Sequence, residues 1–189
     1  MITTDKILLR TEYINWMASF DHRYVLTISF PNRTNHYQTR RLLNLFLKHL
    51  NRKIFKNRYR RGLSFIEGFA VREPTPTEDT DHYHILIFDE GKWLPDKERF
   101  EELILKEAAR FREDRRDIGD RKKCRFGRKL NYIKTVDLQD YYNIFESNLA
   151  ERYTTKNFGR VHIPWDIAND SIGLLTKGDV EFGRRHFSF

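Results

Sequence analysis

The sequence predicts an α+β domain of the ferredoxin-like, split βαβ type, with four to five antiparallel strands in one sheet and helices packed on it. Short runs rich in β-branched and aromatic residues alternate with longer stretches whose apolar residues recur every three or four positions. These patterns follow one another in the order βαββαβ. A chain of 189 residues is also long enough for one domain with a substantial core.

Local composition predicts each strand of this sheet. β-branched and aromatic residues predict strands at 24–30, 63–73, 82–88 and 130–136. Prolines at 74 and 76 end the second strand, and a polar turn joins it to the third as a hairpin. In the βαββαβ topology the first and third strands are central, and the sheet face without helices often presents functional side chains.

The helices are predicted from apolar periodicity. It predicts helices over 5–18, over 38–56 and around Phe100 to Phe111. Asp137 is expected to cap a further helix that begins at Leu138 and continues towards Tyr153. We accordingly expect a helical extension over 1–22, the main domain over 23–157 and a C-terminal extension over 158–189.

Cysteine content and hydropathy exclude several protein classes. Cys124 is the only cysteine, so the chain has no disulfide framework and no cysteine-based zinc site. No apolar run approaches a membrane-spanning length, and the first residues do not resemble a signal peptide. We expect no membrane partner and a reducing, cytoplasmic location in the host cell.

The charge balance indicates a polyanionic partner. Thirty-five Lys and Arg against 27 Asp and Glu give a net charge of +8, which favours nucleic acid before an anionic membrane. Basic residues concentrate at 52–61 and 110–129, with aromatic residues interleaved, as in grooves where bases stack. A solvated basic surface is the alternative. The candidate DNA-binding residues are Arg58, Arg60, Arg61, Arg121, Lys122, Lys123 and Arg125.

His82-Tyr83-His84 is the first motif that could carry chemistry. Side chains alternate along a strand, so the two histidines share one face, about 7 Å apart, while Tyr83 points to the other. Two imidazoles in this arrangement can bind one metal ion. By itself an H-x-H triplet is a weak signal.

Glu73 offers a third metal ligand from the neighbouring strand. It lies near the hairpin turn that brings the second and third strands together. Two histidines and a carboxylate leave coordination positions for water and a phosphate oxygen, which suits Mg²⁺ or Mn²⁺. A solvated strand-end carboxylate is the alternative for Glu73, and Glu67, Glu78 or Asp81 could take its place.

Tyr153-Thr154-Thr155-Lys156 is the second candidate motif. A separation of three residues places Tyr153 and Lys156 on the same side of the predicted helix. The phenol is a candidate nucleophile and Lys156 a candidate phosphate contact. The alternative is a core tyrosine beside a snorkelling lysine. Tyr141 and Tyr142 are the other candidates for the nucleophile.

Together these residues resemble the HUH endonuclease superfamily, specifically the single-tyrosine initiators of rolling-circle replication (Rep proteins). The resemblance spans roughly residues 23–157. It rests on Tyr24-Val-Leu-Thr-Ile-Ser-Phe-Pro31, on the His82-Tyr83-His84 motif with Glu73 before it, and on the Tyr153-x-x-Lys156 motif, in the order that the family has them. No second tyrosine lies four residues from Tyr153, which favours the single-tyrosine type.

The resemblance implies a function. It implies an enzyme that nicks single-stranded or hairpin origin DNA with a divalent metal, leaves Tyr153 linked to the 5′ phosphate and a free 3′ hydroxyl, and later rejoins ends. The sequence has no phosphate-binding glycine loop, so unwinding would fall to a host or separate helicase. Transposases and relaxases of the same superfamily share this chemistry.

Two other classes compete with this interpretation. Gly68-Phe69-Ala70-Val71 faintly resembles an RRM strand, which would make the chain a non-catalytic RNA- or single-stranded DNA-binding module. Glu67 and Glu73 on the same face argue against it, because carboxylates repel phosphate unless a cation intervenes. An iron oxygenase with two histidines and a carboxylate is the third class, but its usual β-barrel is not indicated here.

Overall fold

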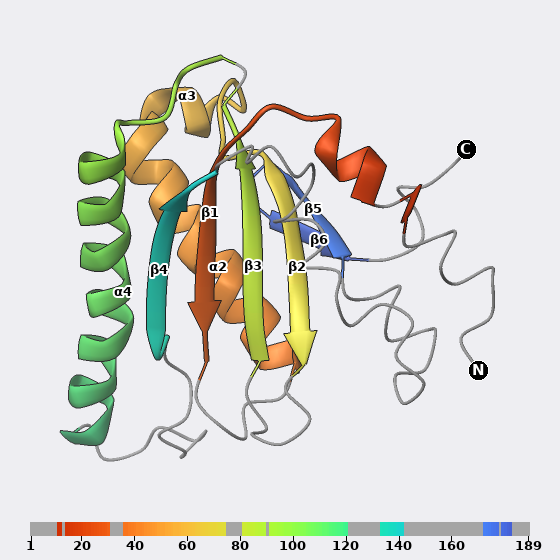
Figure 1. Ribbon diagram of the computed structural model, residues 1–189. Helices are drawn as coiled ribbons and strands as arrows, with labels where there is room; N and C mark the ends of the chain where they lie inside the picture. The colour runs from red at the N-terminus through yellow and green to blue at the C-terminus, as the bar shows by residue number, and fades with distance from the viewer. Residues whose placement is uncertain are drawn as a thin grey trace, which may run out of the picture.

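In the computed structural model, one antiparallel sheet has the strand order β4-β1-β3-β2-β5-β6 (Figure 1). The described residues are 11–12, 14–30, 36–74, 81–89, 91–120, 133–141, 172–177 and 179–182. In chain order the elements are β1 (His22–Ser29), α2 (His36–Phe55), α3 (Asn57–Arg60), β2 (Gly68–Pro74), β3 (Asp81–Phe88), α4 (Lys97–Asp120), β4 (Thr135–Asp140), β5 (Ile172–Thr176) and β6 (Asp179–Phe182).

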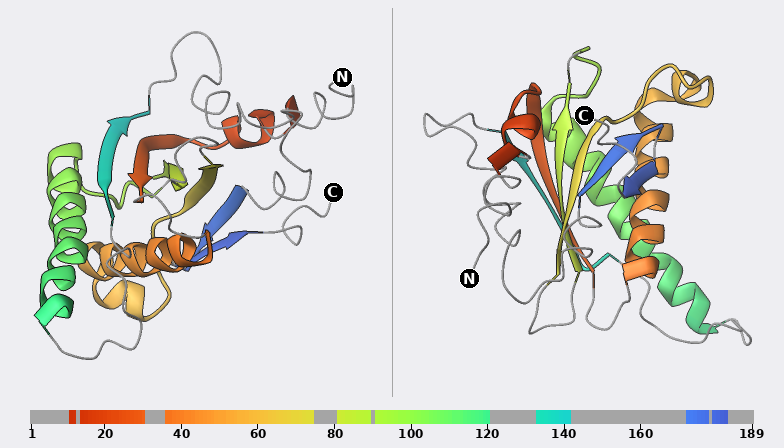
Figure 2. Two further views of the ribbon diagram at one scale, coloured as in Figure 1. Left: turned by 90° about the horizontal axis from the view of Figure 1, so that it is seen from below. Right: turned by 90° about the vertical axis from the view of Figure 1, so that its right-hand side faces the viewer.

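The α+β class and the antiparallel sheet are confirmed. β1 pairs with β3 and β4, and β3 pairs with β2, so the first and third strands are central as expected. Helices α2 and α4 lie together on one face of the sheet (Figure 2). The predicted helices over 38–56 and around 100–111 correspond to α2 and α4.

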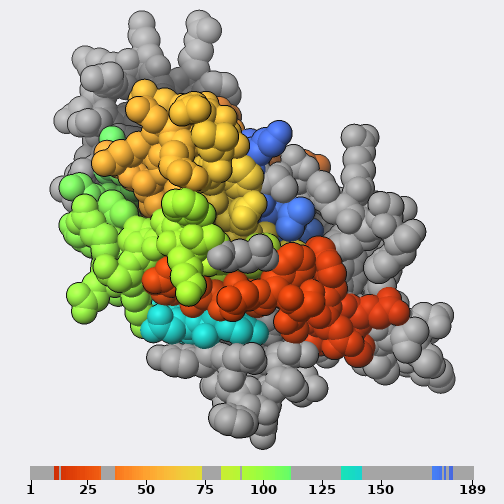
Figure 3. All heavy atoms as spheres, turned by 90° about the horizontal axis from the view of Figure 1, so that it is seen from above, coloured from red at the N-terminus to blue at the C-terminus, as the bar shows by residue number. Residues whose placement is uncertain are grey.

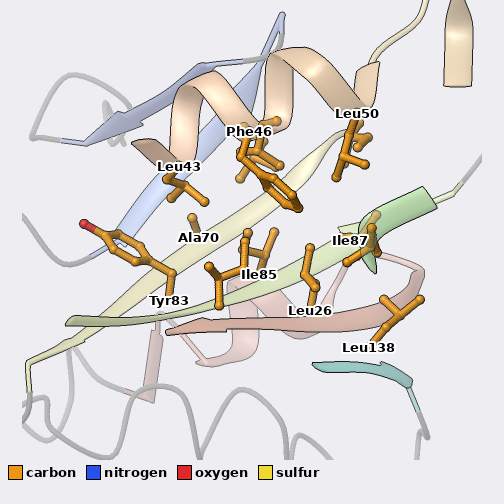
Figure 4. Packing of buried hydrophobic residues seen from close by; sticks show 14 of the residues in the cluster. Leu26, Leu43, Phe46, Leu50, Ala70, Tyr83, Ile85, Ile87 and Leu138 are labelled. Atoms are coloured by element: carbon orange, nitrogen blue, oxygen red, sulfur yellow. The ribbon is translucent and has the colours of Figure 1, made fainter. Parts of the chain in front are cut away.

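The main core lies between the sheet and these two helices. Alternate residues of each central strand point to it, because successive side chains of a strand face opposite ways. Figure 4 shows α2 side chains packed over those of β1, β2, β3 and β4. The labelled residues of this cluster are Leu26, Leu43, Phe46, Leu50, Ala70, Tyr83, Ile85, Ile87 and Leu138.

A second, smaller core covers part of the opposite face. Residues 14–18 are helical, and Met17 lies with Phe69, Leu86 and Phe88 in this cluster. Trp16 and Phe20 pack against it, with the Phe20 and Phe88 rings stacked 4.7 Å apart. The sheet is therefore sandwiched over this half, with α2 on one side and the N-terminal segment on the other (Figure 2).

The second strand is shorter than predicted, since β2 begins at Gly68 and not at Leu63. The chain before it is held as a loop by the fully buried Asn51 of α2. Its Oδ1 accepts a hydrogen bond from the Ile66 amide at 2.6 Å, and its Nδ2 donates to the Leu47 carbonyl. An amide bonded to α2 is not available to a neighbouring strand, so pairing starts later.

The helix predicted from Leu138 is wrong at its start. Thr135–Asp140 forms β4, paired with β1 along its whole length. Asp137 therefore lies in a strand and not at a helix cap. The buried Leu138 contributes to the main core from this strand, so its apolar spacing reflects strand alternation and not helical periodicity. Tyr141 follows β4 without helix, and the predicted helix from 142 onward lies outside the described residues.

The sheet also has one strand more than the upper number expected, because a hairpin of β5 and β6 extends it beyond β2. The hairpin is attached to α2. Asn44 Oδ1 accepts from the Val180 amide at 2.9 Å, and Lys48 Nζ lies 2.9 Å from Asp179 Oδ1. Leu175 and Val180 are buried in the main core.

Gly68 provides a test of the β2–β3 register. Its φ is +157°, and a β-carbon there would lie 2.0 Å from the Leu86 carbonyl oxygen. Gly68→Ala should therefore lower the free energy of unfolding by about 3 kcal/mol or more, measured by chemical denaturation. Gly62→Ala is the matched control, because Gly62 also has positive φ but opens to free space, and should cost about 1 kcal/mol. Equal losses of stability in the two variants would contradict the close approach of Gly68 to the β3 backbone.

Candidate functional site

Polar side chains gather on the face of the sheet opposite α2 and α4, at the end where β2 stops and β3 begins (lower end of the sheet in Figure 1). Glu73 stands directly across from His82, and Ser29 and Thr27 of β1 stand across from His82 and His84. Residues that face each other in an antiparallel pair share one face of the sheet. The three strands thus bring these five side chains together.

Each histidine is held through its Nδ1 atom by a hydroxyl of β1. Ser29 Oγ lies 2.7 Å from His82 Nδ1, and Thr27 Oγ1 lies 3.1 Å from His84 Nδ1. A second hydrogen bond of this kind fixes the ring orientation of a metal-ligating histidine and leaves Nε2 for the ion. The hydroxyls therefore orient both rings on the same face.

Glu73 completes the cluster by contacting His84. Its Oε2 atom lies 2.9 Å from His84 Nε2, on a histidine that is only 7% exposed. Asp137 adds a second carboxylate to the same face, across β1 at the level of Thr27. A face with two carboxylates and two imidazoles favours a cation over a bare phosphate.

The donor set fits a divalent metal, although its side chains do not yet converge. Within the described ranges, no three His, Cys, Asp or Glu side chains are gathered closely enough to hold a metal ion as they stand. However, the β-carbons of directly paired residues lie only about 5 Å apart. Glu73 faces His82 directly and contacts His84, so these three side chains are the ones that could hold an ion.

The other predicted carboxylates lie elsewhere or are undescribed. Glu67 precedes β2, six residues from Glu73 and so about 20 Å away along the strand direction, at the opposite end of the sheet. Asp81 stands across from Pro74, beyond the Glu73–His82 pair. Glu78 lies outside the described residues. Among these carboxylates, the described structure shows a contact with a histidine for Glu73.

The Phe69 side of the same face is closed. Phe69 is 0% exposed, with the Trp16 ring 4.5 Å and the Phe20 ring 5.1 Å away. Phe69 therefore has no exposed face on which a base could stack, although its strand resembles that of an RRM in sequence. Along this face the sheet changes from an apolar, covered half to a polar half that carries the histidines.

Among the candidate nucleophiles, only Tyr141 is described. It follows β4 at the end of the sheet opposite the histidines, where its amide donates to the Arg23 carbonyl and its ring lies 4.8 Å from His22. At least five strand residues, about 17 Å, separate this level from Ser29 and His82. Tyr142, Tyr153 and Lys156 lie outside the described residues.

The DNA-binding candidates of the first basic cluster also lie far from His82 and His84. Arg58, Arg60 and Arg61 belong to α3 and the residue after it, at the end where β2 begins (top of Figure 1). All three are exposed. The structure therefore separates them from the histidine cluster by the length of β3. Arg121, Lys122, Lys123 and Arg125 lie outside the described residues.

Sequence reasoning missed the two hydroxyls. Thr27 and Ser29 alternate with the core residues Leu26 and Ile28, so strand parity alone places them on the histidine face. Strand parity does not give the β1–β3 register, which places Thr27 across from His84 and Ser29 across from His82. That register depends on tertiary packing.

Comparisons of the chain with protein-family models, with curated proteins and with solved structures gave no match. No helix in the described part of the chain is long and apolar enough to cross a membrane.

The contact between His84 and Glu73 is testable without any metal. A double-mutant cycle of His84→Ala and Glu73→Ala, followed by chemical denaturation in the presence of a chelator, should give a coupling free energy of about 1–2 kcal/mol, because both groups are largely shielded from water. Arg99 and Glu102 form the control pair, whose side chains are 58% and 59% exposed. Their coupling should be about 0.5 kcal/mol or less. A zero coupling for His84 and Glu73 would contradict the contact.

Proposed function

We propose that this chain is a metal-dependent endonuclease that nicks single-stranded DNA with a tyrosine nucleophile. The observation that supports it most is the histidine pair on the central strand β3, with each Nδ1 held by a hydroxyl and Glu73 in contact with His84. The proposal includes the finer fold assignment, an HUH-endonuclease-like domain built on the ferredoxin-like arrangement of β1 to β4.

His82, His84 and Glu73 would hold the divalent metal, Mg²⁺ or Mn²⁺. When bound, the ion polarises the scissile phosphate and offsets its charge. Ser29 and Thr27 act as positioning residues, since they fix the two imidazoles before any ion arrives. Such preorganisation matters because a ligand that must first be oriented weakens binding by the entropy it loses.

Tyr153 is the proposed nucleophile. Its phenolic oxygen forms a bond to phosphorus, the bond from phosphorus to the 3′ oxygen breaks, and the phenolic proton ends on that oxygen. The products are a 5′-phosphotyrosine link and a free 3′ hydroxyl, and rejoining is the same reaction in reverse. Lys156 would contact the phosphate as a point charge. The position of Tyr141 at the other end of the sheet favours Tyr153 over Tyr141.

The substrate we propose is single-stranded or hairpin origin DNA, as in rolling-circle replication, with a host or separate helicase as a further partner. A transposase or relaxase of the same superfamily would use identical chemistry. A non-catalytic module of RRM-like fold is the less favoured candidate, because the buried Phe69 offers bases no stacking surface.

Metal binding separates the enzyme from the binding module. Calorimetric titration with Mn²⁺ should give one site per chain, lost in the His82→Ala/His84→Ala double variant. Ser29→Ala should weaken metal binding by about 10- to 100-fold, because the Nδ1 partner of His82 is removed. Thr135→Ala is its control, since Thr135 is an exposed hydroxyl residue on β4 directly across from Ser29. Metal binding that survives in the double variant would refute the assignment.

The nucleophile is identified by the covalent product. With labelled single-stranded DNA and Mn²⁺, the parent should form a protein–DNA adduct, and Tyr153→Phe should form none while retaining DNA affinity, because only a hydroxyl is lost. Lys156→Ala should slow the reaction without abolishing it.

Mass spectrometry of the peptide left on the DNA then locates the link. An adduct on Tyr142 would move the nucleophile but keep the mechanism. If no adduct forms with any single-stranded substrate, the proposed endonuclease is wrong.

A further inference from the structure

Trp93 is an exposed tryptophan at the end of the sheet opposite the histidines. It follows β3, and 59% of its surface is exposed to solvent. In Figure 3 the gold atoms of the α3 region adjoin the yellow-green atoms of the segment after β3 at this end of the molecule. Single exposed hydrophobic side chains are common on protein surfaces, so the surroundings of Trp93 decide whether it could serve as a binding site.

The backbone of Trp93 is anchored by a single carboxylate. Asp89 Oδ1 accepts hydrogen bonds from the amides of Trp93 and Leu94, at 2.7 and 3.1 Å. The other oxygen of Asp89 pairs with Arg23 on β1. The segment is therefore tied to the sheet although its aromatic side chain is exposed.

The indole itself is held in place by two neighbours. A β-carbon at Gly91 would lie 1.9 Å from Trp93 Nε1, so the ring packs directly against this glycine. On another side the Arg58 guanidinium lies 4.3 Å from the ring centroid, and its Nε donates to Ser64 Oγ at 2.9 Å. The indole is positioned before any ligand binds, which reduces the entropy lost on binding.

Further basic residues lie close to Arg58 and Trp93 in the sequence. Arg60 and Arg61 lie two and three residues after Arg58, and Lys92 precedes Trp93; all three are exposed. Within the described part of the chain, none of these three cations forms an ion pair, whereas the nearby Asp89 is paired with Arg23. We call Arg58, Arg60, Arg61, Lys92 and Trp93 the Trp93 patch.

We propose that the Trp93 patch binds single-stranded DNA, with an unpaired base stacked on the exposed part of the indole and phosphates beside the cations. An aromatic ring between cationic side chains is the arrangement by which proteins hold single strands irrespective of sequence. Paired bases within a duplex do not expose the faces that such a ring needs. The patch is about 20 Å from the histidines, the length of β3, so it grips the strand away from the place of cleavage.

This inference extends the proposed function, because it gives the substrate a second contact, but it is tested by binding alone. The probe is a fluorescein-labelled oligothymidylate, with anisotropy read in the presence of a chelator so that no cleavage occurs. Trp93→Ala should raise the Kd by about 5- to 150-fold, the range measured for loss of one base–aromatic stack. Trp93→Phe should recover most of that loss, since it restores a stacking ring.

Two controls distinguish stacking from other causes. Tyr37→Ala removes an aromatic side chain that is 72% exposed on α2, outside the patch, and should leave the Kd unchanged. Arg60→Ala/Arg61→Ala should reduce the slope of log Kd against log salt by about 1.4, for two phosphate contacts to a single strand.

The outcomes separate the two proposals. A Trp93→Ala variant that binds the oligonucleotide like the parent overturns the patch, even if the parent nicks DNA. If Trp93→Ala weakens binding of a duplex oligonucleotide as much as binding of the single strand, the patch is overturned as well, because stacking needs unpaired bases. Conversely, selective loss of single-strand binding supports the patch even if no covalent adduct ever forms, in which case only the endonuclease proposal fails.

Discussion

The pairing of β3 with β1 and β2 determines which side chains lie on each face of the sheet. Tyr83, in the middle of the His82-Tyr83-His84 motif, is buried under α2, with its hydroxyl 3.0 Å from that of Thr39. Because side chains alternate, this anchor fixes both histidines on the opposite face. A slip of one residue would reverse the two faces, burying two imidazoles beneath α2 and exposing Tyr83. The packing of Tyr83 against α2 on one face thus determines that both histidines lie on the other face.

The face opposite α2 and α4 has two halves that differ in composition. Trp16 and Phe20 cover the half around Phe69, so the N-terminal segment completes a second core where no helix of the βαββαβ unit packs. The other half carries Glu73 and the two histidines. Leaving this face uncovered around Phe69 would expose the Phe69 cluster to water.

Much of this arrangement could be predicted from the sequence. Strand composition predicted β1 and β3. Because side chains alternate between the two faces of a strand, the spacing of His82 and His84 predicted that they share one face. Local pattern failed where tertiary contacts decide. Asp137 is a residue type common at helix caps, but its strand pairs with β1. The β5–β6 hairpin depends on α2 residues such as Asn44, which is far away in the chain. The hydroxyls of Thr27 and Ser29 required the register.

The separation of the histidines from the Trp93 patch gives the proposed enzyme two functional ends. At one end the face carries carboxylates and imidazoles, which suit a cation. At the other, arginines and an exposed indole suit a single strand. The claim on which the proposed cleavage depends is that a metal binds between His82, His84 and Glu73. NMR of the histidine ring signals during titration with substoichiometric Mn²⁺ tests it most directly. We predict that the His82 and His84 signals broaden first, while those of His22 and His49, which lie elsewhere in the fold, stay sharp. Broadening that begins at His22 or His49, or that is uniform over all four, would contradict the account.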